Sequence, residues 1–276
     1  MTTEPRFSAP PTALTIAGSD NSAGAGIQAD LKTFSHFGVY GLTAITCVVA
    51  EVPGLVKSIQ AIEPQIVAEQ IELSLEHFPM GALKTGMLYS IELIEAVVAV
   101  LRDRAGAIPV VVDPVMVATS GDPLLQNNAV EAYRTQLLPM ATLVTPNLDE
   151  AGVLLGCAPM RTVEEMEHAG KELSARFGTA FLMKGGHLPG GSAVDLLIDG
   201  DQVWRYEAPF VRNVMTHGTG CTYSAAITAQ LARGLPLPEA VAKAKTYVFE
   251  SIRQSFLWKA DERTVMALNH FAQEPI

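Results

Sequence analysis

The residues His217-Gly218-Thr219-Gly220-Cys221 have the types and spacing of an anion site. They open a predicted helix of small residues, and the two glycines let the backbone turn its N–H groups toward a ligand. The dipole of that helix favours a phosphate at its N-terminus and stabilises the thiolate of a cysteine in the first turn. The alternative is a glycine-rich turn capped by Thr219, with Cys221 as a small core residue.

A second candidate site follows Thr145-Pro146, where Asn147 and Glu150 open another predicted helix. A carboxylate at this place suits Mg²⁺, which keeps several waters and binds few carboxylates. The same spacing, with Asn147 as N-cap and Glu150 three residues later, is that of a capping box that only completes the helix end. The residues alone leave both interpretations open.

Two further charged residues end predicted strands. Lys184 ends an apolar strand and precedes two glycines, so it can reach a phosphate, although a lysine there commonly extends to solvent. Asp113 stands before Pro114, a pair that is typical of turns.

Residues 18–26 follow the first predicted strand as a loop of small residues, and they match neither common glycine-rich nucleotide motif. Such a loop indicates that something approaches the backbone closely.

Strand-like and helix-like segments alternate along the chain, and they must position these residues. We expect strands at 13–17, 42–50, 82–87, 110–113, 143–145 and 180–184, helices at 26–37, 64–78, 91–104, 124–138, 148–155, 163–177, 220–233 and 238–254, and one hairpin at 195–198 and 203–206. Repeated strand–helix units predict a mostly parallel sheet with helices on both faces, whose ligands bind beyond the carboxyl ends of the strands. Asp20, Asp113, Asn147 and Lys184 all fall there. No linker divides the sequence, so we expect a tail at 1–12 and a single domain at 13–276.

Composition and charge narrow the classes of function. The 276 residues are 49% hydrophobic and 17% charged, and 19 basic against 29 acidic residues give a net charge of −10. A nucleic-acid binder would usually be basic, and no apolar run is long enough for a membrane-spanning helix, so we expect neither partner. Cys47, Cys157 and Cys221 are too few and too far apart for a disulfide framework. The first residues form no apolar signal-peptide core, so we expect a cytoplasmic protein.

Taken together, these motifs resemble the hydroxymethylpyrimidine/phosphomethylpyrimidine kinases of thiamine biosynthesis, in the ribokinase-like superfamily. The resemblance is carried by ALTIAGSDNSAGAGIQADLKTF (13–34), GVYG (38–41), KTGML (84–88), VVDPVM (111–116), SGDPLL (120–125), TPNLDEA (145–151), LMKGGH (182–187) and THGTGCTYSAAI (216–227). It covers about 13–250, and the last 20 or so residues add nothing to it. It implies a three-layer α/β/α, Rossmann-like fold, and transfer of phosphate from ATP, with Mg²⁺, to a hydroxymethyl group and then to its monophosphate. We expect a homodimer that binds only this small substrate and the nucleotide.

The resemblance also implies roles for individual residues. The anion-hole and catalytic positions are His217, Gly218, Gly220 and Cys221, with Asp113 near the transferring phosphate; Cys221 stands where ribokinases carry an Asp base. The nucleotide contacts are Asn147, Lys184, Thr216 and Thr219, and the metal contacts are Glu150 and Asp113. The substrate contacts are Gly18, Asp20, Ala25, Asp30, Val49 and Glu51.

The chain departs from the family pattern at positions that bear on the substrate. Asn21 and Ala23 stand where the family has Pro and Gly, Thr119 replaces a usual Lys, and Glu51-Val52-Pro53 replaces a common Gln-Asn-Thr. An ionised glutamate only accepts hydrogen bonds, so Glu51 would pair fully with an aminopyrimidine only if the ring nitrogen were protonated. We expect Glu51 to contact the ring and to favour the pyrimidine; the alternative is a solvated glutamate beside a turn. A pyridoxal kinase and a non-catalytic vitamin sensor on the same fold are the competing functions.

Overall fold

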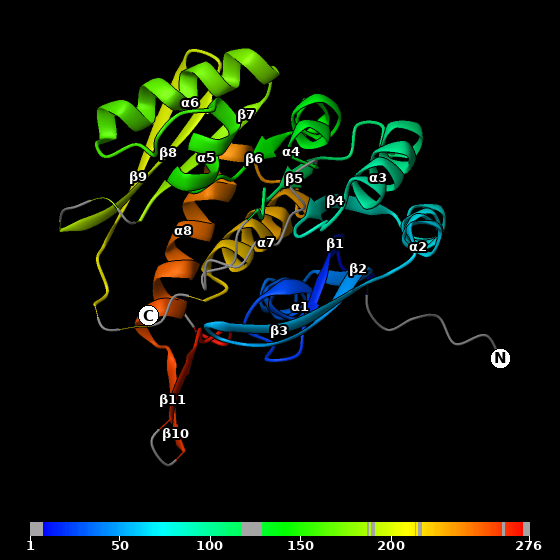
Figure 1. Cartoon of the computed structure of the whole chain (residues 1–276), viewed down its shortest axis with the longest axis horizontal. Coiled ribbons are helices and arrows are strands. Elements are labelled where there is room, and N and C mark those ends of the chain that lie inside the picture. The colour runs from blue at the N-terminus through cyan, green and yellow to red at the C-terminus, as the bar shows by residue number, and fades with distance from the viewer. Residues whose placement is uncertain are drawn as a thin grey trace.

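A nine-stranded sheet forms the centre of the chain in the computed structural model (Figure 1). The structure describes residues 8–116, 129–186, 188, 191–212, 214, 217–260 and 263–272. The strands lie in the order β3-β2-β1-β4-β5-β6-β7-β8-β9; those from β2 to β7 run parallel, and β3, β8 and β9 pair antiparallel. Their bounds are Thr12–Asp20 (β1), Tyr40–Val52 (β2), Leu55–Ala61 (β3), Met80–Thr85 (β4), Val110–Val112 (β5), Leu143–Val144 (β6), Ala180–Gly185 (β7), Ser192–Asp199 (β8) and Gln202–Pro209 (β9).

Helices cover both faces of this sheet, as β5 illustrates. Successive side chains of a strand point to opposite faces, and Val110 and Val112 pack in one core while Val111 packs in the other. The first face carries α2 (Pro64–His77), α3 (Ile91–Arg104), α4 (Ala129–Ala132), α5 (Leu148–Leu155) and α6 (Val163–Phe177), and the second carries α1 (Gly26–His36), α7 (Thr219–Ala232) and α8 (Leu237–Arg253). The predicted three-layer α/β/α architecture with a mostly parallel sheet is confirmed.

The predicted helix at 124–138 is only partly correct. Residues 117–128 lie outside the described part of the chain, and the helix described from Ala129 soon changes its winding. A π-helical turn, η1 (Tyr133–Leu137), follows α4, and a 3-10 turn, η2 (Leu138–Met140), follows η1. Pro139 has no N–H to donate to the carbonyl four residues before it, so a regular α-helix cannot run through this position.

Two antiparallel pairings were not predicted. β3 folds back on β2 at the edge of the sheet, and most of its side chains are exposed or half-buried, which hides the usual apolar alternation. Near the C-terminus, β10 (Phe256–Ala260) and β11 (Arg263–Ala267) form a separate two-stranded hairpin that projects from the body (Figure 1). The predicted hairpin of β8 and β9 is present and is longer than expected at both ends.

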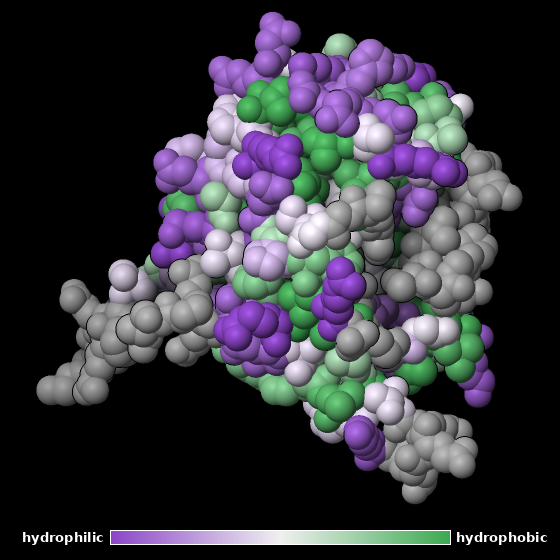
Figure 2. Space-filling model, turned by 90° about the vertical axis from the view of Figure 1, so that its left-hand side faces the viewer, coloured by the Kyte–Doolittle hydropathy of each residue, from purple (hydrophilic) through white to green (hydrophobic). Residues whose placement is uncertain are grey.

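The surface mixes polar and apolar residues. On the face shown in Figure 2, hydrophobic residues gather in small groups between hydrophilic ones. Within the described part of the chain, none of the helices combines the length and the apolarity that crossing a membrane requires.

Candidate active site

A cavity of about 520 Å³ opens beyond the carboxyl ends of the parallel strands, against the first turn of α7. The elements that reach it are far apart in the sequence, because parallel strands bring their carboxyl ends to one edge of the sheet. Most of the predicted site residues line it: Gly18, Asp20, Ala25, Val49, Glu51, Asp113, Asn147, Glu150, Lys184, His217, Gly218, Thr219, Gly220 and Cys221. Thr216 lies outside the described residues.

Gly218 turns the backbone into α7. Its φ of +80° lies in the left-handed region, and a Cβ there would overlap the carbonyl oxygen of Gly24, so only glycine fits. The Thr222 N–H donates to the Gly218 carbonyl at 2.9 Å and closes the first turn. The N–H groups of Thr219, Gly220 and Cys221 precede that bond, so the helix itself gives them no acceptor. Their residues line the cavity, which leaves this helix start open to an anion.

The thiol of Cys221 faces the cavity among charged groups. Burial raises its pKa to about 11, even though the charge of Lys84 and the Gly26 N–H lower it; Asp113 and Asp30 raise it further. We expected the helix start to stabilise a thiolate, but burial outweighs that effect. Cys221 therefore carries its proton at neutral pH.

The carboxylate of Asp20 organises the loop after β1. It accepts hydrogen bonds from the N–H groups of Ser22 at 2.7 Å, Gly24 at 3.1 Å and Ala25 at 2.8 Å. Burial would raise the pKa of Asp20, but hydrogen bonds from His217, Ser22 and the loop backbone lower it below the usual value. Asp20 is therefore ionised, and most of its hydrogen-bonding capacity is used within the loop.

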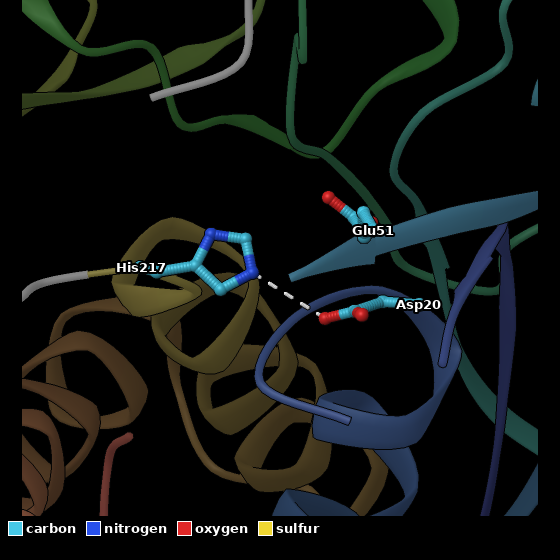
Figure 3. A group of neighbouring side chains, drawn as sticks. All are labelled: Asp20, Glu51 and His217. Carbon is cyan, nitrogen blue, oxygen red and sulfur yellow. Dashed lines mark hydrogen bonds and ion pairs between the residues drawn. The ribbon is translucent and has the colours of Figure 1, made fainter. Parts of the chain in front are cut away.

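Asp20, Glu51 and His217 all line the cavity, and their side chains point toward one another (Figure 3). They come from the end of β1, the end of β2 and the residue before the Gly218 turn, and one polar atom from each lies within 4.8 Å of the others. His217 Nε2 lies 3.4 Å from an Asp20 oxygen. Burial and the Asp20 charge raise the pKa of Glu51, while His217 lowers it. Glu51 is half-buried and lines the cavity, so its side chain is not simply solvated beside the following turn.

Lys184, Asp113 and Glu150 form a second charged group in the lining of the cavity. The Lys184 ammonium lies 3.2 Å from Asp113 Oδ1, and hydroxyl groups of Thr145 and Ser224 donate to the Asp113 carboxylate at 3.1 and 3.2 Å. Burial would raise the pKa of Asp113, but the charges of Lys184 and Lys84 and the hydrogen bonds from Lys184 and Thr145 lower it. Lys184 is 14% exposed, so it is held inside the site and is not a solvent-facing lysine.

Glu150 completes the capping box that its spacing predicts. Its backbone N–H donates to Asn147 Oδ1, and its Oε2 accepts from the Asn147 N–H, both at 2.8 Å. Burial, the charge of Asp113 and the charge of Asp149 raise the pKa of Glu150 to about 7, against the lowering effect of Lys184 and of the Asn147 N–H. The residue therefore caps α5 and also presents a buried carboxyl to the cavity.

A buried ion pair lies behind Cys221, and only one of its members, Asp30, was predicted as a site residue. Lys84 is fully buried, and its ammonium lies 2.7 Å from both oxygens of Asp30, which also accepts from Thr15 at 2.6 Å. Burial would lower the pKa of Lys84, but the charges of Asp30 and Asp113 and the hydrogen bond to Asp30 raise it, so the lysine stays charged. Asp30 does not line the cavity, which differs from the substrate contact expected for it. The signal in the sequence that could have revealed Lys84 is the presence of a lysine inside the otherwise mostly apolar segment 81–85.

Comparison with known proteins agrees with this geometry. The chain matches the phosphomethylpyrimidine kinase family over residues 20–265. It is 47% identical to a hydroxymethylpyrimidine/phosphomethylpyrimidine kinase of Rhizobium meliloti over 87% of this chain and 90% of that protein. An ADP complex of Bacillus subtilis pyridoxal kinase has a similar structure, with a TM-score of 0.87 and 38% identity over 96% of this chain and 98% of that one.

A pyridoxal kinase of Staphylococcus aureus in complex with AMP-PCP and pyridoxal is also similar, with a TM-score of 0.85, 36% identity, and coverage of 96% of this chain and 95% of that one. The similarity thus extends to enzymes named for two different substrates, a hydroxymethylpyrimidine and pyridoxal. The fold, the cavity at the carboxyl edge of the sheet and the match over most of the sequence lead to one conclusion: the chain belongs to the phosphomethylpyrimidine kinase family, in the ribokinase-like superfamily.

Proposed function

We propose that this chain is an ATP- and Mg²⁺-dependent kinase that phosphorylates hydroxymethylpyrimidine, and then its monophosphate, in thiamine biosynthesis. The observation that carries the proposal is the convergence of an open helix N-terminus, Lys184, Asp113 and Cys221 on one cavity. Phosphoryl transfer needs neutralised charge and alignment more than covalent chemistry by the protein, and these groups provide both. A vitamin sensor would need no such groups, so the sensor is the weaker candidate.

The start of α7 and Lys184 are the groups for the phosphates. The N–H groups of Thr219, Gly220 and Cys221 would hold the γ-phosphoryl group, because they are donors fixed by the start of the helix. Lys184 would bind the nucleotide phosphates, with Asn147 and Thr219 as further nucleotide contacts. A Cβ on Gly220 would lie 3.3 Å from Lys184 Nζ, so the ammonium stands directly beside the helix start.

Glu150 and Asp113 fit a magnesium ion. Both offer carboxylate oxygens, the donors that Mg²⁺ prefers. Burial is the main cause of the pKa of about 7 at Glu150, and the neighbouring Asp113 charge adds to it, so a cation placed between the two carboxylates would be favoured. When bound, the ion would neutralise charge on the phosphate oxygens. Glu150 would hold it through water, since one of its oxygens already accepts the Asn147 N–H.

Cys221 is the candidate base. As the substrate hydroxyl oxygen bonds to the γ-phosphorus and the bond to the ADP oxygen breaks, the hydroxyl proton would move to the Cys221 sulfur. Only the thiolate accepts this proton. Because burial raises the thiol pKa to about 11, Cys221 would act from a small ionised fraction, which Lys84 and the Gly26 N–H favour.

Glu51 is the candidate ring contact, together with Gly18, Asp20, Ala25 and Val49 around it. A carboxyl that holds a proton both donates and accepts, as a primary amide does, so it can pair with the ring nitrogen and exocyclic amine of an aminopyrimidine. The raised pKa of Glu51 favours that protonated form. The proton can equally reside on the ring nitrogen, with an ionised Glu51 accepting from both ring groups.

Pyridoxal is the second candidate substrate. The structural likeness to pyridoxal kinases favours it, but pyridoxal has no exocyclic amine, so Glu51 could meet only its phenol or its protonated ring nitrogen. The test is ADP formation by the purified protein with ATP, Mg²⁺ and hydroxymethylpyrimidine, its monophosphate or pyridoxal. We expect the highest kcat/KM with the pyrimidine alcohol. A higher value with pyridoxal would assign the chain to vitamin B6 salvage.

We also propose that residues 13–276 form a single domain behind a tail at 1–12, in a cytoplasmic homodimer. The nine strands from β1 to β9 share one sheet, and the three cysteines are free thiols, as a reducing compartment would keep them.

The dimer is supported by apolar side chains of the β10–β11 hairpin: Phe256, Trp258 and Val265 are exposed on one of its faces. An isolated two-stranded hairpin is marginally stable in water, so a second copy that covers this face would stabilise it. Molar mass by light scattering tests the dimer.

A further inference from the structure

The chain returns to the body after the projecting β10–β11 hairpin. Leu268, His270 and Ala272 are buried. The Asn269 N–H donates to the carbonyl of Ser251 in α8 at 3.1 Å, and the Ala272 N–H donates to the Asn269 carbonyl at 3.1 Å. The C-terminal segment 268–272 is therefore a tight turn anchored in the core, although its sequence carries no motif of the family.

The ring of His270 contacts the first turn of α7. Its Nε2 lies 3.0 Å from Oγ1 of Thr222, and both side chains are buried, at 3% and 0% exposure. The Tyr247 hydroxyl donates to the His270 carbonyl at 3.1 Å and holds the backbone from the other side. Thr222 is the neighbour of Cys221 in the sequence, and its N–H closes the turn on Gly218.

The direction of this hydrogen bond follows from the charge state of His270. Burial and the charges of Lys32 and His36 lower its pKa to about 4, although a hydrogen bond to the Leu268 carbonyl raises it. The ring is therefore neutral at physiological pH, with one donor and one acceptor nitrogen. Since one ring N–H donates to Leu268, Nε2 is the acceptor and the Thr222 hydroxyl is the donor. A change at either residue leaves a buried polar atom without its partner.

We propose that the His270–Thr222 hydrogen bond is a latch by which the C-terminal segment holds the first turn of α7 in the position that phosphoryl transfer requires. The inference rests on the proposed function of that turn as the phosphoryl site. Donors stabilise a transition state only if they are fixed before the reaction, and a displacement of about 1 Å can cost up to 100-fold in rate. His270 touches no reacting atom, so it is a positioning residue.

The test compares Thr222→Val and His270→Ala with a matched control on the same helix. Thr228 is as buried as Thr222, but its hydroxyl donates at 2.7 Å to the Ser224 carbonyl within α7, so Thr228→Val removes a comparable bond away from the C-terminal segment. Both latch variants should lower kcat roughly tenfold and leave both KM values within about twofold. The double variant should lose no more than either single variant, because both remove one bond. His270→Gln, which keeps a donor and an acceptor, should retain most of kcat.

Each assay is run well below the unfolding temperature of the variant, so that lost stability does not appear as lost rate. Wild-type kcat in the latch variants, an equal loss in Thr228→Val, or additive losses in the double variant would overturn the latch. If the wild type turned over no acceptor, the proposed function would fail, and the latch would be tested separately by iodoacetamide. In a Cys157→Ser background, with the modified peptide mapped by mass spectrometry, both latch variants should alkylate Cys221 several-fold faster than Thr228→Val. Equal rates would overturn the latch without reference to turnover.

Discussion

Two opposed influences set the pKa of the Cys221 thiol. Burial holds the proton on sulfur, while the charge of Lys84 and the Gly26 N–H stabilise the thiolate. At the pKa of about 11 that results, the ionised fraction grows tenfold with each pH unit across the neutral range. At neutral pH such a cysteine is mostly a neutral thiol when the substrates bind. The fraction present as thiolate, the form that can accept a proton, grows only as the pH rises.

The first prediction concerns that proton. In the wild type, kcat at saturating substrates should rise with pH from about 7 to 9, and Cys221→Ala should lower kcat by about 10²–10⁴-fold and remove the slope. Stopped-time ADP assays across this range measure both effects, and circular dichroism checks that the variant is folded. A flat wild-type profile, or full turnover by the alanine variant, would reduce the thiol to a packing role. Cys221→Ser is a weaker test, because a hydroxyl still forms hydrogen bonds.

The second prediction concerns Glu51. The complex between the Glu51 carboxyl and an aminopyrimidine holds one proton, on either the carboxyl or the ring nitrogen. At a pH where the free protein and the free pyrimidine have both lost this proton, binding must take up a proton from solution. The groups that face Glu51 are Asp20 and His217, and they shift its pKa in opposite directions. The dissociation constant of hydroxymethylpyrimidine, measured by calorimetry, should weaken by up to about tenfold per pH unit at alkaline pH in the wild type. Glu51→Gln should remove this dependence, and equal pH profiles for the two proteins would contradict the pairing.

The roles of several residues could not be predicted from the sequence alone, for physical reasons. Asp30 and Lys84 are 54 positions apart, and only the packing of α1 on β1, beside β4 in the sheet, brings them together as a buried pair. Asn147 and Glu150 were easier, because a capping box is a local pattern and is present as predicted. The raised pKa of Cys221 depends on burial by distant segments, which no local pattern around Gly218–Cys221 contains.

At the scale of elements, two loops meet at the cavity. The Gly218 turn before α7 packs against Gly24 of the loop after β1, and His217 reaches the Asp20 carboxylate that shapes that loop. The order of these elements was predictable, because strands and helices alternate with clear periodicity. The β2–β3 pairing was not, because β3 is a largely exposed edge strand, and β10–β11 forms a hairpin apart from the main sheet.

The third prediction tests the loop. Asp20→Ala leaves the N–H groups of Ser22, Gly24 and Ala25 without their carboxylate, at a cost of about 1–3 kcal/mol for each donor that stays buried. The loop should loosen, so the KM for the pyrimidine should rise more than the KM for ATP. Ser22→Ala is the control, because it removes only one 3.0 Å hydroxyl contact to Asp20. Equal changes in both KM values would indicate a general loss of structure instead.

At the scale of the whole molecule, the Lys84–Asp30 pair joins the central strand β4 to the helix layer of α1. Both side chains are fully buried. Removing one partner of such a pair costs about 3–5 kcal/mol, since an uncompensated charge stays in the interior. The pair also places a positive charge behind Cys221 in a chain whose net charge is −10. The same ion pair thus contributes to the stability of the fold and to the electrostatic environment of Cys221.

The fourth prediction follows from that pair. Lys84→Met should lower the free energy of unfolding, measured in urea, by about 3–5 kcal/mol. The double variant Lys84→Met/Asp30→Asn should recover much of this loss, because neither charge of the pair is left without its partner. Turnover should stay low in the double variant, since the Lys84 charge that favours the Cys221 thiolate is gone. Full turnover in that variant would show that Lys84 serves stability alone.

The most direct test of the central claim follows the phosphoryl group itself. Purified protein is incubated with Mg²⁺, hydroxymethylpyrimidine and ATP labelled at the γ-phosphate, and the products are separated and identified by mass spectrometry. We expect label first in the pyrimidine monophosphate and then in the diphosphate, with Lys184→Ala impaired in both steps. Label that stays in ATP, or that appears only in inorganic phosphate, would contradict the claim.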